Sequence, residues 1–377
     1  MSFTLLDDPS RATRLADRLR SEESIALDCE AAGFHRYSDR LCLVQLSIPE
    51  GDYILDPLAY DVGPVLRELL EDPNVEVLMH GADFDIRLLD RDLDIHVRGL
   101  FDTQAAAALL GERSLGLQSL LESELGVRLS KKYQRADWAR RPLPADMLEY
   151  AANDTRHLHA LASRLRARLR EKGRLEWAHE EFEELEAVRW EEDEDEDPVT
   201  RVKRARDMPP REVTALREAL AWRDAVARER DRAPFRVVHD HALVEAIRAR
   251  PESVEELGAV KGMNGRLARE EGEGLLERLR RVAKLPADQL VPYPDPRGNG
   301  SGRPPPEVED RANELKSVRN SRSAELAIDR GTLLSNAMLL EIARHVPSSL
   351  EELRAVPGMK AWQVEALGDE LLARLQG

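Results

Sequence analysis

One stretch of this sequence occurs twice, and the repeat limits how the second half of the chain can fold. Residues 251–263 read PESVEELGAVKGM and residues 347–359 read PSSLEELRAVPGM, so the two copies lie 96 residues apart. The same spacing pairs Leu243 with Leu339. The apolar residues of both copies recur at helical intervals. The sequence therefore predicts two copies of one small, all-helical module.

The composition around these copies predicts the domain boundaries. The stretch between them is rich in proline and glycine, and an unbroken acidic run, EEDEDED, precedes the first copy. Two copies joined by a long tether indicate a tandem of domains and not a stacked solenoid. We predict an α/β domain over residues 1–190, a charged linker over 191–207, a first helical module over 208–285, a Pro/Gly-rich linker over 286–307 and a second module over 308–377.

Residues 1–190 combine strand-like and helical patterns. The runs SIALDCE, RLCLVQLSI and GDYILD are separated by turn residues and predict an antiparallel meander. VEVLMH predicts a central buried strand, and helical periodicity follows it. Pro144 and Gly173 have the character of helix boundaries and predict one long helix between them. Together these patterns predict a mixed sheet flanked by helices.

Charge and cysteine content exclude several classes of protein. The net charge of −16 argues against a nonspecific nucleic-acid coat protein, because phosphate binding requires clustered lysine and arginine, but it does not exclude local basic surfaces. No run of about 18 apolar residues could span a membrane, and the N-terminus lacks a secretory signal pattern. We therefore expect reduced thiols at Cys29 and Cys42, a cytoplasmic location and no membrane partner.

Two acids follow a predicted buried strand near the N-terminus. Asp28 and Glu30 stand in IALDCEAAGF, separated by one residue. Side chains two positions apart on a strand point to the same face, so these carboxylates share one small volume. Two negative charges at such a short distance repel each other, or one carboxyl group keeps its proton because its pKa is raised. A bound cation would remove this conflict.

Two later motifs add further acids. HGADFDIRLL places Asp83 and Asp85 in the first helical turn after the VEVLMH strand. EYAANDTRHL places Tyr150 and Asp154 four residues apart on one helix face. Each motif alone has an ordinary explanation, because acids favour helix N-termini and helix surfaces. The ordered combination with the D-x-E motif is what points to chemistry.

This ordered set resembles the DEDDy group of 3′–5′ exonucleases, and within it the ribonuclease D family. Asp28 and Glu30 match the first motif, Asp85 the second, and Tyr150 with Asp154 the third. The related DEDDh group would have histidine at position 149, where this chain has glutamate. YSDRLCLVQLS, FDTQAAAALL and KKYQRADWARRPLP also resemble this family. The repeated modules resemble HRDC domains, which the family shares with RecQ-type helicases, so the resemblance implies a ribonuclease H-like exonuclease domain followed by two HRDC domains.

The resemblance also implies two divalent metal ions and a role for each acid. Two ions roughly 3.5–4 Å apart could activate water, stabilise the leaving oxygen and neutralise the transition state. Oxygen ligands favour Mg²⁺ or Mn²⁺. Asp28 would bridge both ions, and Glu30 and Asp154 would complete the ion that activates water. Asp85 would hold the second ion, while Tyr150, with a reference pKa of about 10, would orient water and would not act as a strong base.

Substrate contacts are expected in two loops. Lys131, Gln134 and Trp138, within KKYQRADW, could contact phosphates, sugars or bases, with packing as the alternative role of Trp138. Phe34 and Tyr37 follow the first motif and could wedge against the terminal base or belong to the core. The HRDC modules are expected to contact nucleic acid, with protein as the alternative partner.

The leading hypothesis is a metal-dependent 3′–5′ exoribonuclease that releases nucleoside 5′-monophosphates from structured RNA precursors. The resemblance implies tRNA precursors as the RNA partner, and we expect a monomer. One alternative is a 3′–5′ DNA exonuclease in repair, because HRDC domains also occur in helicases. A second alternative is a noncatalytic nucleic-acid-binding scaffold, against which the complete set of acids argues.

Overall fold

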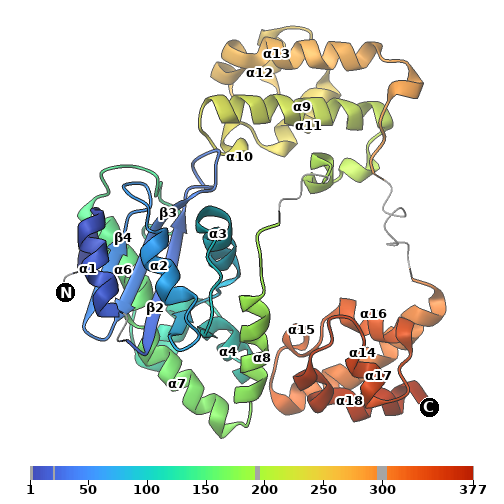
Figure 1. Cartoon of the computed structure of the whole chain (residues 1–377). Helices are drawn as coiled ribbons and strands as arrows, with labels where there is room; N and C mark the ends of the chain where they lie inside the picture. Colours follow the sequence, from blue (N-terminus) through green and yellow to red (C-terminus); the bar gives the residue numbers. More distant parts are fainter. Residues whose placement is uncertain (1–2, 20–21, 192–195, 295–303, 377) are drawn as a thin grey trace.

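The computed structural model of the chain describes residues 3–19, 22–191, 196–294 and 304–376. An α/β domain occupies the N-terminal half, and two helical modules lie on different sides of it (Figure 1). The predicted acidic run and Pro/Gly-rich linker lie partly outside the described residues. Of the helices described, none combines the length and the apolar character needed to cross a membrane.

Six strands form one mixed sheet in the order β1-β4-β3-β2-β5-β6. Their bounds are β1 Phe3–Leu6, β2 Ser24–Ala31, β3 Leu41–Ile48, β4 Gly51–Leu55, β5 Glu76–Met79 and β6 Leu100–Asp102. β2, β3 and β4 pair antiparallel, which confirms the predicted meander. β1 is parallel to β4, and β5 is parallel to both β2 and β6. The fold is therefore the predicted mixed α/β sheet with flanking helices.

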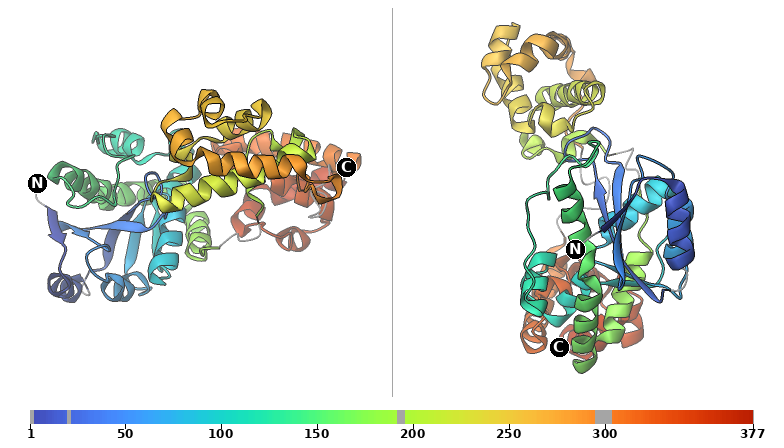
Figure 2. Two further views of the ribbon diagram at one scale, coloured as in Figure 1. Left: turned by 90° about the horizontal axis from the view of Figure 1, so that it is seen from above. Right: turned by 90° about the vertical axis from the view of Figure 1, so that its left-hand side faces the viewer.

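Every residue of β3 is buried because helices cover both faces of the sheet. Val44 and Leu46 enter a core on the side of α1 (Pro9–Leu19) and α2 (Gly63–Leu70). Leu43 enters a separate core on the opposite side, beneath α6 (Ala145–Arg156). Figure 2 shows α1 and α2 on one side of the sheet and α6 on the other. Alternate positions along the strands consequently face different environments.

The remaining helices of this domain follow the sheet strands or pack over them. Their bounds are α3 Asp83–Leu93, α4 Thr103–Leu110, α5 Leu117–Leu125, α6 Ala145–Arg156, α7 Leu158–Glu171 and α8 Leu175–Glu186. The prediction of one long helix from Pro144 to Gly173 is wrong, because the chain leaves helical geometry at His157. The end of α6 is instead fixed to the sheet: the Thr155 and Ser47 hydroxyls are hydrogen bonded at 2.7 Å, and Arg156 pairs with Asp52 at 2.6 Å. A local helical pattern in the sequence does not reveal these long-range contacts.

The two helical modules repeat the same order of elements. The first contains α9 Pro210–Glu229, α10 Pro234–Val237, α11 Asp240–Ala249, α12 Val254–Ala259 and α13 Gly265–Lys284. The second contains α14 Pro306–Leu326, α15 Arg330–Leu333, α16 Asn336–His345, α17 Leu350–Arg354 and α18 Ala361–Gln376. Left-handed backbone recurs at the repeat spacing, with φ of 44° at Asp231 and 52° at Ala327, and 88° at Gly262 and 79° at Gly358. The predicted repeat is thus present in the backbone as well as in the sequence.

Short 3-10 helices lie within the two predicted linkers. η1 (Pro198–Arg201) and η2 (Ala205–Asp207) bury Val199 and Ala205 in the core of the first module. The later part of the predicted charged linker therefore packs against that module. η3 (Ala287–Gln289) follows α13.

Candidate active site

β2 presents two acids on the α6 side of the sheet. Asp28 lies opposite Gln45, and Glu30 lies opposite Leu43, in the antiparallel pairing with β3. Directly opposed residues point to the same face, so both carboxylates face the α6 side. The pairing register shifts immediately after Glu30, where the strand ends and the following loop begins. The sequence motif thus sits where a buried strand opens into a loop.

α6 brings the third acid to this place. Asp154 lies one residue before Thr155, whose hydroxyl is anchored to β3. Carboxylate oxygens of Asp28, Glu30 and Asp154 all lie within 4.8 Å of one another. The structure thus brings together acids from the first and third sequence motifs, 126 residues apart at their extremes.

The first turn of α3 separates its two acids. Asp83 is exposed and forms an ion pair with Arg87 at 3.0 Å. Asp85 is only 7% exposed, and its side chain is hydrogen bonded to that of Asp28. Asp85 therefore lies beside the three clustered acids, whereas Asp83 is already neutralised at the surface.

Burial and mutual repulsion raise the pKa values of these acids. Burial raises the pKa of Asp28 to about 7, and burial together with the Asp28 charge raises the pKa of Asp154 to about 8. The pKa values of Glu30 and Asp85 are also raised well above their ordinary values, mainly by burial. Among the described residues, no lysine, arginine or histidine forms an ion pair with any of the four. Within the described residues, the cluster therefore lacks a positive counter-charge.

A glutamine that sequence reasoning did not single out lies next to this cluster. Gln45 is fully buried, and its amide nitrogen and oxygen have no hydrogen-bond partner among the described residues. It faces the same side of the sheet as Asp28, its direct neighbour across the strands. Its one sequence signal is a polar residue in the middle of the apolar run LCLVQLSI. Hard oxygen ligands and an unpartnered buried amide together suit a hydrated Mg²⁺ or Mn²⁺ ion.

Tyr150 lies over the cluster within an aromatic group. Its ring contacts Tyr133 edge-on at a centroid distance of 5.9 Å and lies 6.2 Å from the ring of Trp138. Burial and the nearby charges of Asp154 and Glu30 raise its pKa above the ordinary value. The hydroxyl therefore keeps its proton at neutral pH and can donate a hydrogen bond.

The loop of residues 131–141 forms the outer wall of the site. Lys131 and Gln134 are exposed and line an open hollow of about 570 Å³. Trp138 is only 2% exposed and packs in the core beneath α6, so the structure favours its alternative role as a packing anchor. Arg141 fixes the end of the loop through two hydrogen bonds of 2.6 Å to Asp56.

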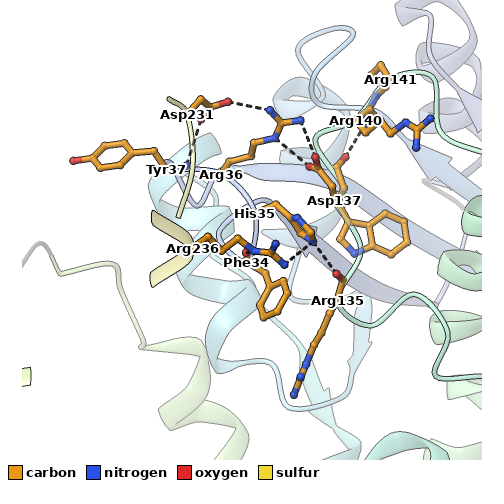
Figure 3. Close-up of polar contacts among 11 residues, drawn as sticks. Phe34, His35, Arg36, Tyr37, Arg135, Asp137, Arg140, Arg141, Asp231 and Arg236 are labelled. Carbon is orange, nitrogen blue, oxygen red and sulfur yellow. Dashed lines mark hydrogen bonds and ion pairs between the residues drawn. The ribbon is translucent and has the colours of Figure 1, made fainter. Parts of the chain in front are cut away.

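Phe34 and Tyr37 lie apart from the clustered acids. Figure 3 shows both residues on the loop that meets the first helical module. The ring of Phe34 lies 5.5 Å from that of Phe235, and the Tyr37 hydroxyl donates to Asp224 at 3.0 Å. Neither side chain lines the hollow beside Tyr150. Both aromatics therefore lie at the contact with the first module and not beside the clustered acids.

Comparison with known proteins assigns the family. A family model described as a 3′–5′ exonuclease matches residues 3–170, and an HRDC domain model matches residues 213–279 and 308–375. Ribonuclease D of Pseudomonas paraeruginosa is 30% identical over 98% of this chain and 96% of its own length. The crystal structure of Escherichia coli RNase D covers 100% of this chain and 99% of its own, with 26% identity and a TM-score of 0.71.

A eukaryotic structure extends the comparison. The catalytic core of RRP6 from Trypanosoma brucei covers 75% of this chain and 81% of its own, with 28% identity and a TM-score of 0.66. Domain order, fold and full-length similarity agree with the ordered acids in the sequence. The chain therefore belongs to the ribonuclease D family of 3′–5′ exoribonucleases.

Proposed function

We propose that this enzyme uses divalent metal ions to remove nucleotides from the 3′ ends of RNA, releasing nucleoside 5′-monophosphates. The observation that carries the proposal is the group of three carboxylates within 4.8 Å, with which no cation of the described residues forms an ion pair. E. coli RNase D is described as an exoribonuclease involved in structured RNA processing. We accordingly propose structured RNA precursors, including tRNA precursors, as substrates, and a cytoplasmic monomer as the working form.

Asp28, Glu30 and Asp154 would hold one ion, and Asp28 with Asp85 would hold the other. When bound, two Mg²⁺ or Mn²⁺ ions would lower the pKa of water and offset negative charge in the transition state. Deprotonation of Asp28 and Asp154 accompanies metal binding, because a carboxylate binds a cation only in its charged form.

Tyr150 and Gln45 supply neutral hydrogen-bonding groups beside the acids. Tyr150 keeps its proton and donates to the attacking water, which fixes the direction of attack. The buried amide of Gln45 can hold either the Asp28 carboxylate or a water molecule next to it. The aromatic neighbours of Tyr150 restrict its ring and so preserve its position.

The test is digestion of a 5′-labelled, unstructured RNA and the matched DNA strand, with Mg²⁺, Mn²⁺ or EDTA. Asp28→Asn should reduce hydrolysis by roughly 10³-fold or more, since one charged group of the transition-state environment is lost. Asp83→Asn is the matched control: this neighbouring acid is paired at the surface with Arg87 and should leave activity unchanged. Full activity of Asp28→Asn, or activity in EDTA, would refute the metal proposal.

Tyr150→Phe separates positioning from binding. Loss of one hydroxyl should lower turnover by roughly 10–100-fold with an unchanged Kd for RNA. A weakened Kd with normal turnover would instead assign Tyr150 to substrate stacking. Preference of the wild-type chain for the DNA strand would reject the RNA assignment.

A further inference from the structure

The first HRDC module touches the nuclease domain only a short distance along the chain from the first acidic motif. Arg236 donates a hydrogen bond to the carbonyl oxygen of Phe34 at 2.7 Å. The backbone N–H of Ala233 donates to the carbonyl oxygen of His35 at 3.2 Å. Arg36 bridges two elements, pairing with Asp231 of the module at 3.3 Å and with Asp137 at 2.8 Å (Figure 3). The loop of residues 33–37 thus joins the module to the 131–141 loop beside the active site.

Two hollows of the nuclease domain adjoin each other along this path. One, of about 200 Å³, is lined by Tyr150 and Asp154 and shares Lys132 and Tyr133 with the hollow of about 570 Å³ described above. The larger hollow is also lined by Arg135. The two hollows therefore adjoin at Lys132 and Tyr133, between the clustered acids and Arg135.

A third hollow continues the route on the first module. It measures about 310 Å³ and is lined by four arginines, Arg230, Arg232, Arg236 and Arg266. Phe34 joins it to the nuclease side: its ring centroid lies 5.7 Å from the guanidinium carbon of Arg135 and 4.7 Å from that of Arg236. Phe34 and Phe235 are 38% and 39% exposed. This pair of partly exposed rings, called the aromatic step below, lies at the junction of the nuclease domain and the first module.

The acids along this route are neutralised, whereas several cations are not. Asp137 pairs with Arg36, and Asp146 pairs with Lys132 at 2.9 Å. Glu149, which lines the smaller hollow, pairs with Arg156 at 2.8 Å. Four cations on this route form no ion pair with a carboxylate within the described part of the chain: Lys131, Arg135, Arg232 and Arg236. A protein of net charge −16 thus carries a locally basic path that begins at its active site.

Comparison of the two modules shows that this basic face is specific to the first. The four positions that hold the arginines are occupied, 96 residues later, by Leu326, Ile328, Thr332 and Trp362. Ile328 and Trp362 are buried at 3% and 2% exposure. The ring of Trp362 stacks on that of Trp177 of the nuclease domain at 5.1 Å. One module buries this face against the nuclease domain. The other touches that domain through Arg236 and leaves a basic hollow beside the contact.

We propose that the RNA strand leading to the active site runs across Lys131 and Arg135, over Phe34, and onto the arginine hollow of the first HRDC module. This inference rests on the proposed function and adds the route of the substrate upstream of its 3′ end. Phosphates are bound by Lys131, Arg135 and Arg232, and the aromatic step stacks against a base. The second module lies outside this route.

The first experiment measures RNA binding by the full chain in an Asp28→Asn background, with a 3-nucleotide and a 20-nucleotide unstructured RNA. Arg232→Gln should weaken binding of the longer RNA by roughly 3–10-fold and lower the salt slope of log K by about 0.7, the value for one lost contact on a single strand. Arg170→Gln on α7 is the control, an exposed arginine on the nuclease domain away from the route, and should change neither. Equal weakening of both RNAs, or no change with the longer one, would overturn the route.

Phe34 is tested by substitutions that preserve its apolar contact. Phe34→Leu should weaken binding of the longer RNA by roughly 5–100-fold through lost base stacking, and Phe34→Trp should restore it. Failure of Phe34→Trp to bind better than Phe34→Leu would show that the ring serves the module contact alone.

Crosslinking tests the order of contacts. An RNA carrying one photoreactive base is placed on the full chain, with the base at increasing distance from the 3′ end. Crosslinks should move from the 131–135 segment to Phe34 and Phe235, and then to α13. Crosslinks to the second module, or none on the first, would reject the proposal. Hydrolysis of the 3-nucleotide RNA by the chain with Asp28 intact reports separately on the proposed function, because that RNA does not reach the first module.

Discussion

The two HRDC modules share a repeat but are attached to the nuclease domain by different kinds of contact. The first has a hydrophobic core of its own and meets the nuclease domain through exposed aromatics and partly exposed ion pairs such as Arg36–Asp231. The core of the second is continuous with that of the nuclease domain. There Lys360 lies between Glu181 and Glu184 at 2.7 and 2.6 Å. The first module is therefore a separately packed domain, called the arm below. The second module is packed into one unit with the nuclease domain.

The difference teaches that module fold and module attachment are encoded at separate positions. Leu257 and Leu353, one repeat apart, are both fully buried within their modules. Arg266 and Trp362 are also one repeat apart, yet one is exposed at a hollow and the other is buried against Trp177. Exposed ion pairs contribute about 0.2–1 kcal/mol each, whereas truncating a buried tryptophan costs about 3–5 kcal/mol. A few substitutions on one face therefore decide which kind of attachment forms.

The largest expected effect comes from removing the aromatic stack. Trp362→Ala should lower the free energy of unfolding by about 3–5 kcal/mol, because it deletes a buried ring and leaves a cavity. The matched change in the first module, Arg266→Ala, should cost less than about 1 kcal/mol, since the arginine is exposed and its ion pair with Glu270 is at the surface. Denaturant unfolding of both variants measures the contrast, and similar losses would show that the modules are attached alike.

Metal binding should stabilise one module and not the other. At a Mg²⁺ or Mn²⁺ concentration of about 100 times Kd, binding stabilises the folded nuclease domain by about 2.7 kcal/mol. The second module shares the core of the nuclease domain, so metal binding should lower the rate of slow amide exchange in α14–α18. The exchange rate in α9–α13 should stay unchanged, because the first module has a separate core. Hydrogen exchange with and without metal measures this, with Asp28→Asn as the control that loses the response. Protection of both modules would contradict separate cores.

Neutralising one clustered acid should stabilise the metal-free chain in a pH-dependent manner. The pKa of Asp154 is raised to about 8 from an ordinary value of 3.8. Between these values the folded state holds a proton that the unfolded state has lost, so stability falls as pH rises from about 4 to 8.

Asp154→Asn removes the contribution of Asp154 to this dependence and should gain roughly 1–2 kcal/mol over the metal-free wild type at pH 8, with little gain at pH 4. Thermal unfolding at the two pH values tests the sign. The shared core should transmit the gain to α14–α18 as well. A gain largest at pH 4 would contradict the raised pKa.

The smallest expected effect concerns the arm. Arg36→Gln removes the bridge between Asp137 and Asp231 and should cost about 1 kcal/mol or less, because these groups are partly exposed. Raising salt to about 0.5 M should likewise loosen the first module in the wild type, since screening weakens such pairs. Fluorescence energy transfer between the first module and the nuclease domain would report both changes. A second label pair on the second module should show none.

Most of the fold and the central acids could be predicted because their signals are local. The D-x-E motif at the end of an apolar strand, the antiparallel runs and the 96-residue repeat all depend on short-range patterns. The break at His157 could not be predicted, because it accompanies contacts of Thr155 and Arg156 with distant strands. Gln45 was overlooked because one polar residue in an apolar strand gains meaning only from its neighbour across the sheet.

The placement of the aromatics shows the same limit. Phe34 follows the first acidic motif closely, but its ring faces a partner 201 residues later in the chain. Trp138 lies among cations in the sequence, yet the chain path turns it into the core. Sequence proximity to a motif predicts proximity in space only along the strand or helix that carries the motif.

The continuous core of the nuclease domain and second module has a consequence for synthesis. Trp177 cannot meet Trp362 until the 185 residues that separate them have been made. At 5–20 residues per second, this interval lasts roughly 10–40 s. The first module has its own core and can fold on the ribosome during that time. The face of α8 that carries Trp177 stays exposed until the second module has been made. The order of assembly therefore differs from the order of translation: the middle of the chain matures before its beginning is complete.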